Sequence, residues 1–405
     1  MILTEKIVMR NSHKDYKRIL ELCHASKNLY NATLYDLKQH YLKTGKYKTY
    51  YTQRPEFVRD KNPDYRSLPA KIAGQTMNSV HGGYKSFFRL MKKKAEGKYE
   101  KPIKIPKYLN KGGFYPVKIP NDAISRKVTG LGNGLYEITV APKELNIKVV
   151  TRVNKPKTIE FCPKGGHILV LVTYEVTKPE LLPDNGNYLA IDLGVNNLAT
   201  CIDNQGNPAT IYNGRNVKSI NQAYNKYIAR LSSKCGEVKK TKRMKSITAK
   251  RHRRIDWILH NVSRDIVNQA VSHNNNTIVI GQNKEWKQGI RIGKRNNQNF
   301  VQIPFARLIG MIEYKSALVG IRVILTEENY TSKCSALDRE KVCKHKTYTG
   351  CRVKRGLFKT SKGILINADV NGAINIMRKV VPDTDVFGNG IEAGAVQPVK
   401  ITFKN

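Results

Sequence analysis

The sequence predicts two kinds of fold in one chain, an α+β N-terminal half and an α/β C-terminal half. Helical periodicity comes first, and short alternating runs separated by Gly, Pro and Asn follow it over about residues 102–177. The linker-like segment "TKPELLPDNGN" then leads into hydrophobic strands that alternate with helices. With 405 residues, 40% of them hydrophobic, the chain can bury more than one core.

The N-terminal half begins with an alternating strand at residues 2–10. Apolar positions at helical spacing predict a helix over residues 15–45. A second helix is predicted to start at a Ser67 cap, with Pro69 near its first turn. The alternating runs that follow predict a small β-barrel or sheet.

The C-terminal half begins with a predicted β-hairpin, "YLAIDLGVNNLATCIDNQGNPATIY", whose first strand carries Asp192 and whose turn is "NQGN". It is followed by a basic helical region over residues 219–272, the strand "NTIVI", a helix near "IPFARLIGMIEYKSALVG" and the strand "IRVILTEE". The last helix, in "NADVNGAINIMRKVV", carries Asp369. This order of hairpin, helix, strand, helix, strand and helix matches an RNase H-like α/β core.

The charge of the chain predicts a polyanionic partner. Lys and Arg total 72 against 31 acidic residues, which gives a net charge of +41. Basic clusters occur at residues 89–111, 239–255 and 352–362. Each alone also fits a solvated helix face, but three together suit a protein that neutralises many nucleic-acid phosphates. The candidate backbone contacts of the central cluster are Lys239, Lys240, Lys242, Arg243, Arg251, Arg253 and Arg254.

Simple features argue against several other classes of protein. No apolar run approaches the roughly 20 residues of a membrane-spanning helix. The N-terminus lacks the apolar stretch and cleavage site of a signal peptide. Seven cysteines, an odd number spread over a long chain, are not a disulfide framework. We therefore expect a reduced, cytoplasmic protein that binds nucleic acid and no membrane.

Asp192 and Asp369 are the first candidates for catalysis. An RNase H-like core supports phosphodiester cleavage by two divalent metals roughly 3.5 to 4 Å apart, and hard ions such as Mg²⁺ take carboxylate oxygens. A charge in the apolar strand of Asp192 is costly unless it is paired or metal-bound. The alternatives are an Asp192 that caps a turn and an Asp369 that caps the last helix. Asn371 and Asn375 lie on one face of that helix.

Four motifs in order resemble those of a known family. They are "AIDLGVNNLAT", "YTSKC", "RGLF" and "NADVNGAINIMRKV". Together with "LCHASKNLYNATLY" and "LPAKIAGQTMNSVHGGYKSFFRLMK" in the N-terminal half, they resemble the TnpB proteins, the OrfB-type RuvC nucleases of bacterial insertion sequences. TnpB proteins are similar to compact type V CRISPR effectors: they bind a guide RNA from the element's end and cleave matching DNA beside a short flanking motif. The resemblance covers nearly the whole chain.

The resemblance implies a domain organisation and a set of partners. The implied domains are a wedge β-barrel (1–10 and 101–182), an inserted helical recognition domain (11–100), an RNase H-like RuvC nuclease (186–329 and 366–405) and a target-nucleic-acid-binding insert (330–365). Lys71 and Gln75, on one helical face, are the candidates that read the flanking motif, with ordinary solvent-facing residues as the alternative. The partners would be a guide RNA and double-stranded target DNA. The assembly would be a monomeric ribonucleoprotein, in a prokaryotic cytoplasm and at the nucleoid when DNA-bound.

The chain departs from the family at Gly281, where the usual members end a strand with a metal-binding Glu. Glu285, Glu327 and Glu328 are the replacements considered, and Glu285 fits a surface loop better. Neighbouring strands lie about 4.8 Å apart, so a Glu from the next strand could cross over a residue without a side chain. Alternation sends only one of Glu327 and Glu328 to the metals. Glu328 matches a TnpB subset with the catalytic Glu in an "E..TS" stretch, and Glu327 is the alternative.

The insert departs from the family as well, because usual members carry two CxxC pairs that signal zinc. Here the candidate ligands are Cys334, Cys343, His345 and Cys351, and none of the cysteines has that spacing. A zinc site is therefore the alternative. A zinc-free loop closed by polar contacts is favoured.

Two functions from different classes follow, an RNA-guided Mg²⁺-dependent DNA endonuclease and a nuclease-dead RNA-guided DNA-binding repressor. Asp192, Asp369 and a nearby acidic pair favour the enzyme, whereas the loss of the usual Glu favours the binder. A DNA-strand transferase is a weaker third alternative, because the separate N-terminal half argues against it.

Overall fold

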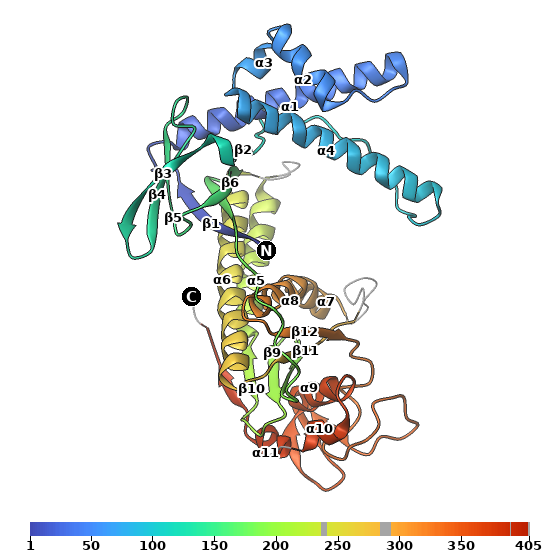
Figure 1. The fold of residues 1–405 in the computed structure, drawn as a ribbon. Helices are drawn as coiled ribbons and strands as arrows, with labels where there is room; N and C mark the ends of the chain where they lie inside the picture. The colour runs from blue at the N-terminus through green and yellow to red at the C-terminus, as the bar shows by residue number, and fades with distance from the viewer. Residues whose placement is uncertain (236–240, 284–292, 389, 404–405) are drawn as a thin grey trace. The chain divides into compact units, whose positions relative to one another are not determined.

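The computed structural model describes residues 1–235, 241–283, 293–388 and 390–403 (Figure 1). The chain forms two compact units, Met1–Thr177 and Lys178–Asn405. No helix in the described part of the chain is long and apolar enough to cross a membrane.

Four helices occur in the first unit. They are α1 (Tyr16–Thr44), α2 (Tyr50–Arg59), α3 (Pro63–Arg66) and α4 (Ala70–Ala95). The prediction for α1 is confirmed, and Gly45 ends it in the left-handed region at φ 64°, with its N–H bonded to the Tyr41 carbonyl. The predicted start of α4 is wrong: Ser67 ends α3, and α4 begins directly after Pro69. Proline fits there because the first N–H groups of a helix have no helical partner.

The strands of the first unit form two sheets. They are β1 (Ile2–Arg10), β2 (Val117–Pro120), β3 (Ile124–Gly132), β4 (Leu135–Val140), β5 (Ile147–Thr151), β6 (Pro156–Lys164) and β7 (His167–Glu175). The strand orders are β1-β7-β6-β2 and β3-β4-β5. Within residues 1–177, all of which the structure describes, the predicted β-barrel is therefore not closed by hydrogen bonds. Pro120 ends β2 without a donor, and the turn Asn121–Ala123 leads the chain into the second sheet.

Helices and sheets of the first unit share one core. Ile19 of α1 and Ile72 of α4 are fully buried in the same cluster as Phe161 of β6 and Ile138 of β4. Burial of the apolar faces of both helices against the sheets is the main source of their stability.

A mixed sheet forms the centre of the second unit. Its described strands are β8 (Tyr188–Asp192), β9 (Asn197–Asp203), β10 (Thr210–Asn213), β11 (Thr277–Gly281), β12 (Arg322–Thr326) and β16 (Val399–Ile401). The order is β12-β11-β8-β9-β10-β16, with β12, β11 and β8 parallel. This confirms the predicted position of the Gly281 strand between the other two. The predicted single hairpin is three strands, because Gly194 permits an extra tight turn: a Cβ there would lie 2.7 Å from the Asn197 carbonyl oxygen.

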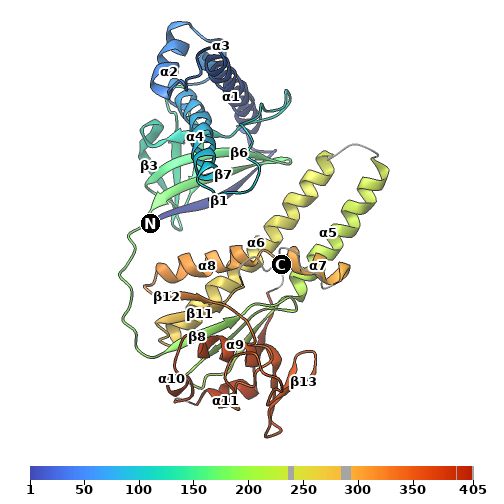
Figure 2. The same ribbon diagram turned by 90° about the vertical axis from the view of Figure 1, so that its right-hand side faces the viewer.

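Helices cover both faces of this sheet (Figure 2). They are α5 (Arg215–Lys234), α6 (Lys242–Ser272), α7 (Lys294–Val301), α8 (Phe305–Ala317), α9 (Ala368–Arg378), α10 (Asp383–Phe387) and α11 (Ile391–Val396). Leu259 of α6 and Leu308 of α8 share one apolar cluster with Ile278 of β11. Ile374 of α9 belongs to the cluster around Ala190 on the other face. A sheet buried on both faces needs strands that are apolar almost throughout, as these are.

The insert between β12 and α9 contains a small sheet. Its strands are β13 (Cys351–Lys354), β14 (Leu357–Lys359) and β15 (Leu365–Asn367). Asn371 and Asn375 of α9 are fully buried and hold the start of this insert. The Asn371 Oδ1 accepts the N–H of Ala336. The Asn375 Nδ2 donates to the carbonyls of Thr331 and Cys334, at 2.9 and 2.7 Å.

Candidate active site

Asp192 and Gly281 lie side by side at one end of the sheet. Ile191 pairs with Ile280 in the parallel ladder of β8 and β11, and Asp192 and Gly281 are the next residues. The carboxylate of Asp192 also lies against α9, where a Cβ on Gly372 would come within 2.9 Å of its Oδ2. Two glycines thus surround Asp192, one beside it in the sheet and one on the helix above it.

Glu328 lies over Gly281. Gly281 pairs with Thr326 of β12, and Glu328 follows two residues later. A Cβ on residue 281 would lie 2.7 Å from both Cγ and Oε1 of Glu328 and 2.5 Å from Cδ1 of Ile376. Such distances are too short for nonbonded atoms, so the carboxylate of Glu328 occupies its position only because residue 281 is glycine.

Glu327, the alternative to Glu328 as the third acid, has different surroundings. It is exposed, and its carboxylate accepts a hydrogen bond from its neighbour Asn329 at 3.2 Å. Its carbonyl accepts from Lys379, the C-cap residue that follows α9, at 2.9 Å. Glu285, the third residue considered, lies outside the described residues.

Asp369 lies in the first turn of α9 and is not its cap. Asn367 is the N-cap, and its side chain accepts from the N–H groups of Asp369 and Val370. The carboxylate of Asp369 therefore faces other partners. Its Oδ2 accepts from Asn197 Nδ2 at 2.6 Å, and its Oδ1 lies 3.6 Å from the guanidinium of Arg352.

The three carboxylates influence one another electrostatically. Burial raises the pKa of Asp192 well above its usual value, and the nearby charges of Glu328 and Asp369 raise it further. Burial also raises the pKa of Glu328 to about 7, although the Lys379 ammonium opposes this. Carboxylates gathered at one place repel each other unless cations compensate them. Perturbed carboxyl groups of this kind are typical of functional sites.

One oxygen of this site has no hydrogen-bond partner among the described residues. Oε1 of Glu328 is buried and makes no hydrogen bond to any described residue. An unsatisfied buried carboxylate oxygen is costly, and a hard cation is the ligand that suits it. In this arrangement no three His, Cys, Asp or Glu side chains among the described residues converge closely enough to hold one ion. The carboxylate oxygens nevertheless have the chemistry that divalent ions such as Mg²⁺ prefer.

A basic cavity adjoins Asp369, and sequence reasoning did not assign its residues to the site. It has a volume of about 530 Å³, which lies in the range of small-ligand pockets. Its basic lining residues are Arg215, Arg352, Arg355 and Lys400. Arg352 and Arg355 belong to the basic cluster at residues 352–362, so the sequence contained a signal, but their proximity to Asp369 depends on the fold of the insert.

Two family models match this half of the chain. One, described as "Probable transposase" (OrfB_IS605), matches residues 171–287, and the other, "Cas12f1-like, TNB domain", matches residues 305–376. The chain is 22% identical over 413 residues to the "TnpB-like protein ORF457" of Acidianus two-tailed virus, which covers 90% of this chain and 84% of the relative. Over most of its length the chain is therefore similar to a TnpB-like protein.

Two further proteins are similar to this chain. A "CRISPR-associated endodeoxyribonuclease Cas12f2" from a Micrarchaeota archaeon is 28% identical over 231 residues, covering 53% of this chain and 40% of the relative. A solved Cas12f1-sgRNA-target DNA complex covers 92% of this chain and 98% of its own, with 16% identity and a TM-score of 0.36.

Among the described residues, the predicted zinc candidates of the insert do not form a group of three that could hold one ion. The Sγ of Cys343 lies 3.4 Å from Nε2 of His345. Cys334 is buried and donates to the Cys343 carbonyl, while Cys351 is exposed. Carboxylates make the closing contacts instead: Glu340 accepts the N–H groups of two insert residues.

The basic residues of α6 differ in their surroundings. Lys242, Arg243, Arg253 and Arg254 are exposed along the helix, whereas Arg251 is half-buried. Two contacts occupy the Arg251 guanidinium, a donation to Asn221 Oδ1 at 2.8 Å and one to the Gln302 carbonyl at 3.3 Å, so its charge acts within the protein. Lys239 and Lys240 lie outside the described residues.

The flank-reading candidates lie on α4. Lys71 is exposed, but its ammonium lies 3.1 Å from the Asp122 carboxylate and donates to the Asp122 carbonyl. Gln75 is half-buried one turn further along. The ion pair is exposed and therefore weak, which leaves Lys71 able to exchange Asp122 for another partner.

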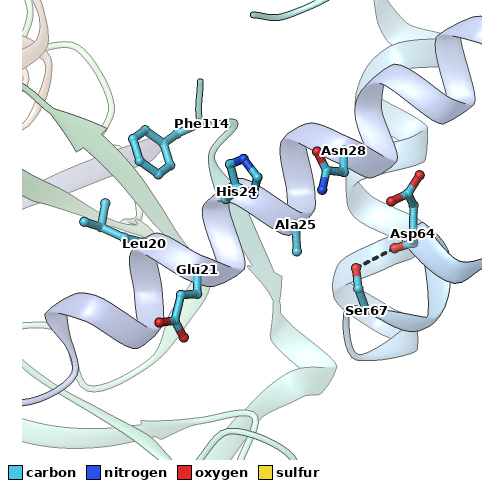
Figure 3. A pocket seen from close by; sticks show the side chains of 8 residues that line it. All are labelled: Leu20, Glu21, His24, Ala25, Asn28, Asp64, Ser67 and Phe114. Atoms are coloured by element: carbon cyan, nitrogen blue, oxygen red, sulfur yellow. Dashed lines mark hydrogen bonds between the residues drawn. The ribbon is translucent and has the colours of Figure 1, made fainter. Parts of the chain in front are cut away.

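The first unit has a hollow of its own between α1 and the region of α3 (Figure 3). Its volume is about 380 Å³. Glu21 and Asp64 contribute carboxylates to its wall, and Phe114 covers one side of His24 in an edge-to-face contact. This acidic lining has the wrong sign for phosphate, in contrast to the cavity beside Asp369.

Proposed function

We propose that this protein is an RNA-guided DNA endonuclease that cleaves DNA complementary to a bound guide RNA next to a short flanking motif. The observation that carries the proposal is the position of Glu328, which reaches over Gly281 toward Asp192. With Asp369 from α9, three elements then contribute acids to one end of the sheet. Convergence of carboxylates from separate elements is the requirement of metal-dependent phosphodiester cleavage.

Asp192, Glu328 and Asp369 are the residues that would hold Mg²⁺. Two ions bound there would activate a water molecule and stabilise the leaving oxygen of the phosphodiester. The chain itself gathers the negative charge that attracts them. Gly281 and Gly372 make room for two of the carboxylates, and Asn197 fixes one oxygen of Asp369.

Arg352 supplies positive charge at the same place. Its guanidinium faces Asp369, and it lines the basic cavity together with Arg215, Arg355 and Lys400. Guanidinium groups bind phosphate through paired N–H donors. In this proposal the four side chains hold the backbone of the strand to be cut beside the acids.

The charge of the whole chain supports a nucleic-acid complex. A guide RNA supplies sequence specificity by base pairing, so the protein needs a basic surface for the heteroduplex and a small surface that reads the flanking duplex. The net charge of +41 suits the first task. On α6 we assign backbone contacts to Lys242, Arg243, Arg253 and Arg254, while Lys71 and Gln75 of α4 are our candidates for the flanking motif.

The domain roles and partners belong to the same proposal. Residues 11–100 would form the recognition helices, residues 1–10 and 101–182 the wedge, and residues 330–365 the insert that contacts target DNA. The endodeoxyribonuclease activity named for the Micrarchaeota relative supports DNA as the substrate. We propose a guide RNA from the transposon end and a monomeric ribonucleoprotein.

A nuclease-dead DNA-binding repressor is the second candidate function. Asp369 already has two partners, Asn197 and Arg352, and such pairing would also suit a site that binds no metal. The unpartnered oxygen of Glu328 favours the enzyme, because a site without metal gains nothing from a buried, unsatisfied carboxylate.

A plasmid-cleavage assay tests the proposal. The ribonucleoprotein is purified with its copurifying RNA and incubated with a plasmid that carries the matching target beside a randomised flank, in Mg²⁺ or in EDTA. We expect cleavage of the matched plasmid in Mg²⁺ only, and none by Asp192→Ala. Target binding without any cleavage by the wild type would favour the repressor, and absence of a defined RNA would contradict both functions.

A further inference from the structure

Glu328 is held by a residue that follows β11, the strand that ends with Gly281 in place of a Glu. After Gly281, the Gln282 N–H continues the ladder to β12 by donating to the Thr326 carbonyl at 2.8 Å. Asn283 comes next, and its side chain turns toward Glu328. The Asn283 Oδ1 accepts the backbone N–H of Glu328 at 3.0 Å, and its Nδ2 lies 3.4 Å from the Glu328 Oε2. Both ends of one amide therefore contact one residue.

The carbonyl of Glu328 is held from the other side. Thr331 donates to it with its hydroxyl at 2.8 Å and with its N–H at 3.2 Å. Thr331 is in turn fixed by Asn375 of α9, whose Nδ2 donates to the Thr331 carbonyl at 2.9 Å. The backbone of Glu328 is thus bound through both its N–H and its carbonyl, so little is left to vary except the side-chain torsions.

The two oxygens of the Glu328 carboxylate differ. Oε2 faces the Asn283 amide, whereas Oε1 is buried without a hydrogen-bond partner among the described residues and lies over Gly281. The hydrogen-bond donor at Oε2 restricts the side-chain torsions of Glu328, and Oε1 is thereby directed to the site. Partners of this kind orient metal-ligating carboxylates in many proteins.

The geometry points to Asn283 as a positioning residue that aims the Glu328 carboxylate across Gly281 at the metal site. This inference rests on the proposed function. The strand end that lacks an acid then contributes two things to the site, the space at Gly281 and the amide at Asn283. Removal of the amide leaves Glu328 in place but free to turn away, so metal affinity falls more than protein stability.

The test compares Asn283→Ala with the wild type and with Gln282→Ala as the matched control. Gln282 is the adjacent residue, and alanine keeps the backbone N–H that it contributes to the ladder. Mn²⁺ binding to the protein without nucleic acid is measured by the loss of the free-ion EPR signal, and thermal unfolding is measured on the same samples. We expect Mn²⁺ affinity to fall roughly 10- to 100-fold in Asn283→Ala and to stay near wild type in Gln282→Ala.

Cleavage supplies the second measurement. We expect the Mg²⁺ concentration for half-maximal cleavage to rise by a similar factor, with a smaller change of the rate at saturating Mg²⁺. Should Asn283→Ala fail to fold, Asn283→Leu keeps the side-chain size, removes both contacts and should give the same loss. Equal Mn²⁺ affinity and equal Mg²⁺ dependence in the Asn283 variant and the control would overturn the inference. A wild type that binds Mn²⁺ but cuts no DNA would overturn the proposed function instead, and the EPR comparison would still decide the role of Asn283.

Discussion

In the second unit, the carboxylates of the insert and the Glu328 carboxylate at the end of the sheet have opposite surroundings. In the insert, all four oxygens of Asp338 and Glu340 accept hydrogen bonds from Ser335, Thr349 or Ser361. At the end of the sheet, Glu328 keeps one buried oxygen without a partner among the described residues. Asp338 and Glu340 close a loop through their hydrogen bonds, whereas Glu328 keeps an oxygen that a cation would satisfy.

The pKa values follow the same division. Burial alone would raise the pKa of Asp338, but hydrogen bonds from Ser335 and Ser361 hold it below its usual value. The pKa of Glu328 is raised to about 7 by burial, with only the Lys379 charge opposing it. Acids whose ionised form is stabilised serve structure, whereas acids whose ionised form is strained are candidates for function.

Apart from removal of one of the acids themselves, the largest effect is expected from filling the space at Gly281. Alanine would place a Cβ 2.7 Å from the Glu328 carboxylate, which must move, and a shift of about 1 Å at a reacting centre costs roughly 100-fold in rate. Cleavage by Gly281→Ala should fall by about that factor, and Gly281→Val should abolish it. RNA binding, measured by copurification, should stay unchanged.

Two controls separate this effect from general disruption. Gly310→Ala adds the same methyl group where a Cβ meets nothing within 4 Å, and it should cleave like wild type. Ile376→Val removes the Cδ1 that lies 2.5 Å from the new Cβ, so restored cleavage in Gly281→Ala with Ile376→Val would assign the effect to Ile376 and not to Glu328.

A smaller effect is expected in the insert. Asp338→Asn weakens the contacts to Ser335 and Ser361 and should destabilise the insert by about 2 kcal/mol. Because the folded-state pKa of Asp338 is lowered, its contribution is present above the usual carboxyl pKa and is lost as the pH falls through the folded-state value. Hydrogen exchange of residues 335–361 at neutral and acidic pH measures both. Unchanged exchange at neutral pH would mean that the insert is closed by other contacts.

The smallest effect, of opposite sign, is expected for Glu328 without metal. Its folded-state pKa of about 7 lies above the usual 4.5, so the folded protein loses stability as the pH rises through that window. Glu328→Gln lacks this pH-dependent loss of stability. Between pH 5 and pH 8 it should therefore gain roughly 1 kcal/mol of unfolding free energy relative to wild type. The gain is small because the side chain is only half-buried. Thermal unfolding in EDTA tests this. A stability difference that is independent of pH would mean that the carboxylate is not strained.

The sequence was sufficient to predict where Asp192 and Glu328 lie relative to Gly281. Asp192 could be recognised because a charged residue in an apolar strand is costly unless it is paired or metal-bound. The parallel order of three strands placed Glu328 beside Gly281. Asn283 and Arg352 were missed for a common reason. The partner of each, Glu328 or Asp369, is distant in sequence. Neither the loop position of Asn283 nor the basic cluster that contains Arg352 therefore indicates which acid it contacts.

The errors concern details that tertiary packing decides. Pro120 and the turn after it divide the expected barrel into two sheets, although the alternation of each strand was correct. The alternative role of Asp369 as the helix cap is excluded, because Asn367 is the cap and the Asp369 carboxylate accepts from Asn197 instead. Competition between nearby candidates for one position depends on backbone angles that composition does not fix.

The central claim is that Glu328, and not its neighbour, completes the acidic site. The most direct test is the Mg²⁺-dependent cleavage rate of a matched plasmid by ribonucleoproteins carrying Glu328→Gln or Glu327→Gln, with target binding measured in parallel. The account predicts loss on the order of 10³-fold or more for Glu328→Gln, with binding retained, and a near-wild-type rate for Glu327→Gln. Full activity of Glu328→Gln, or loss confined to Glu327→Gln, would contradict it.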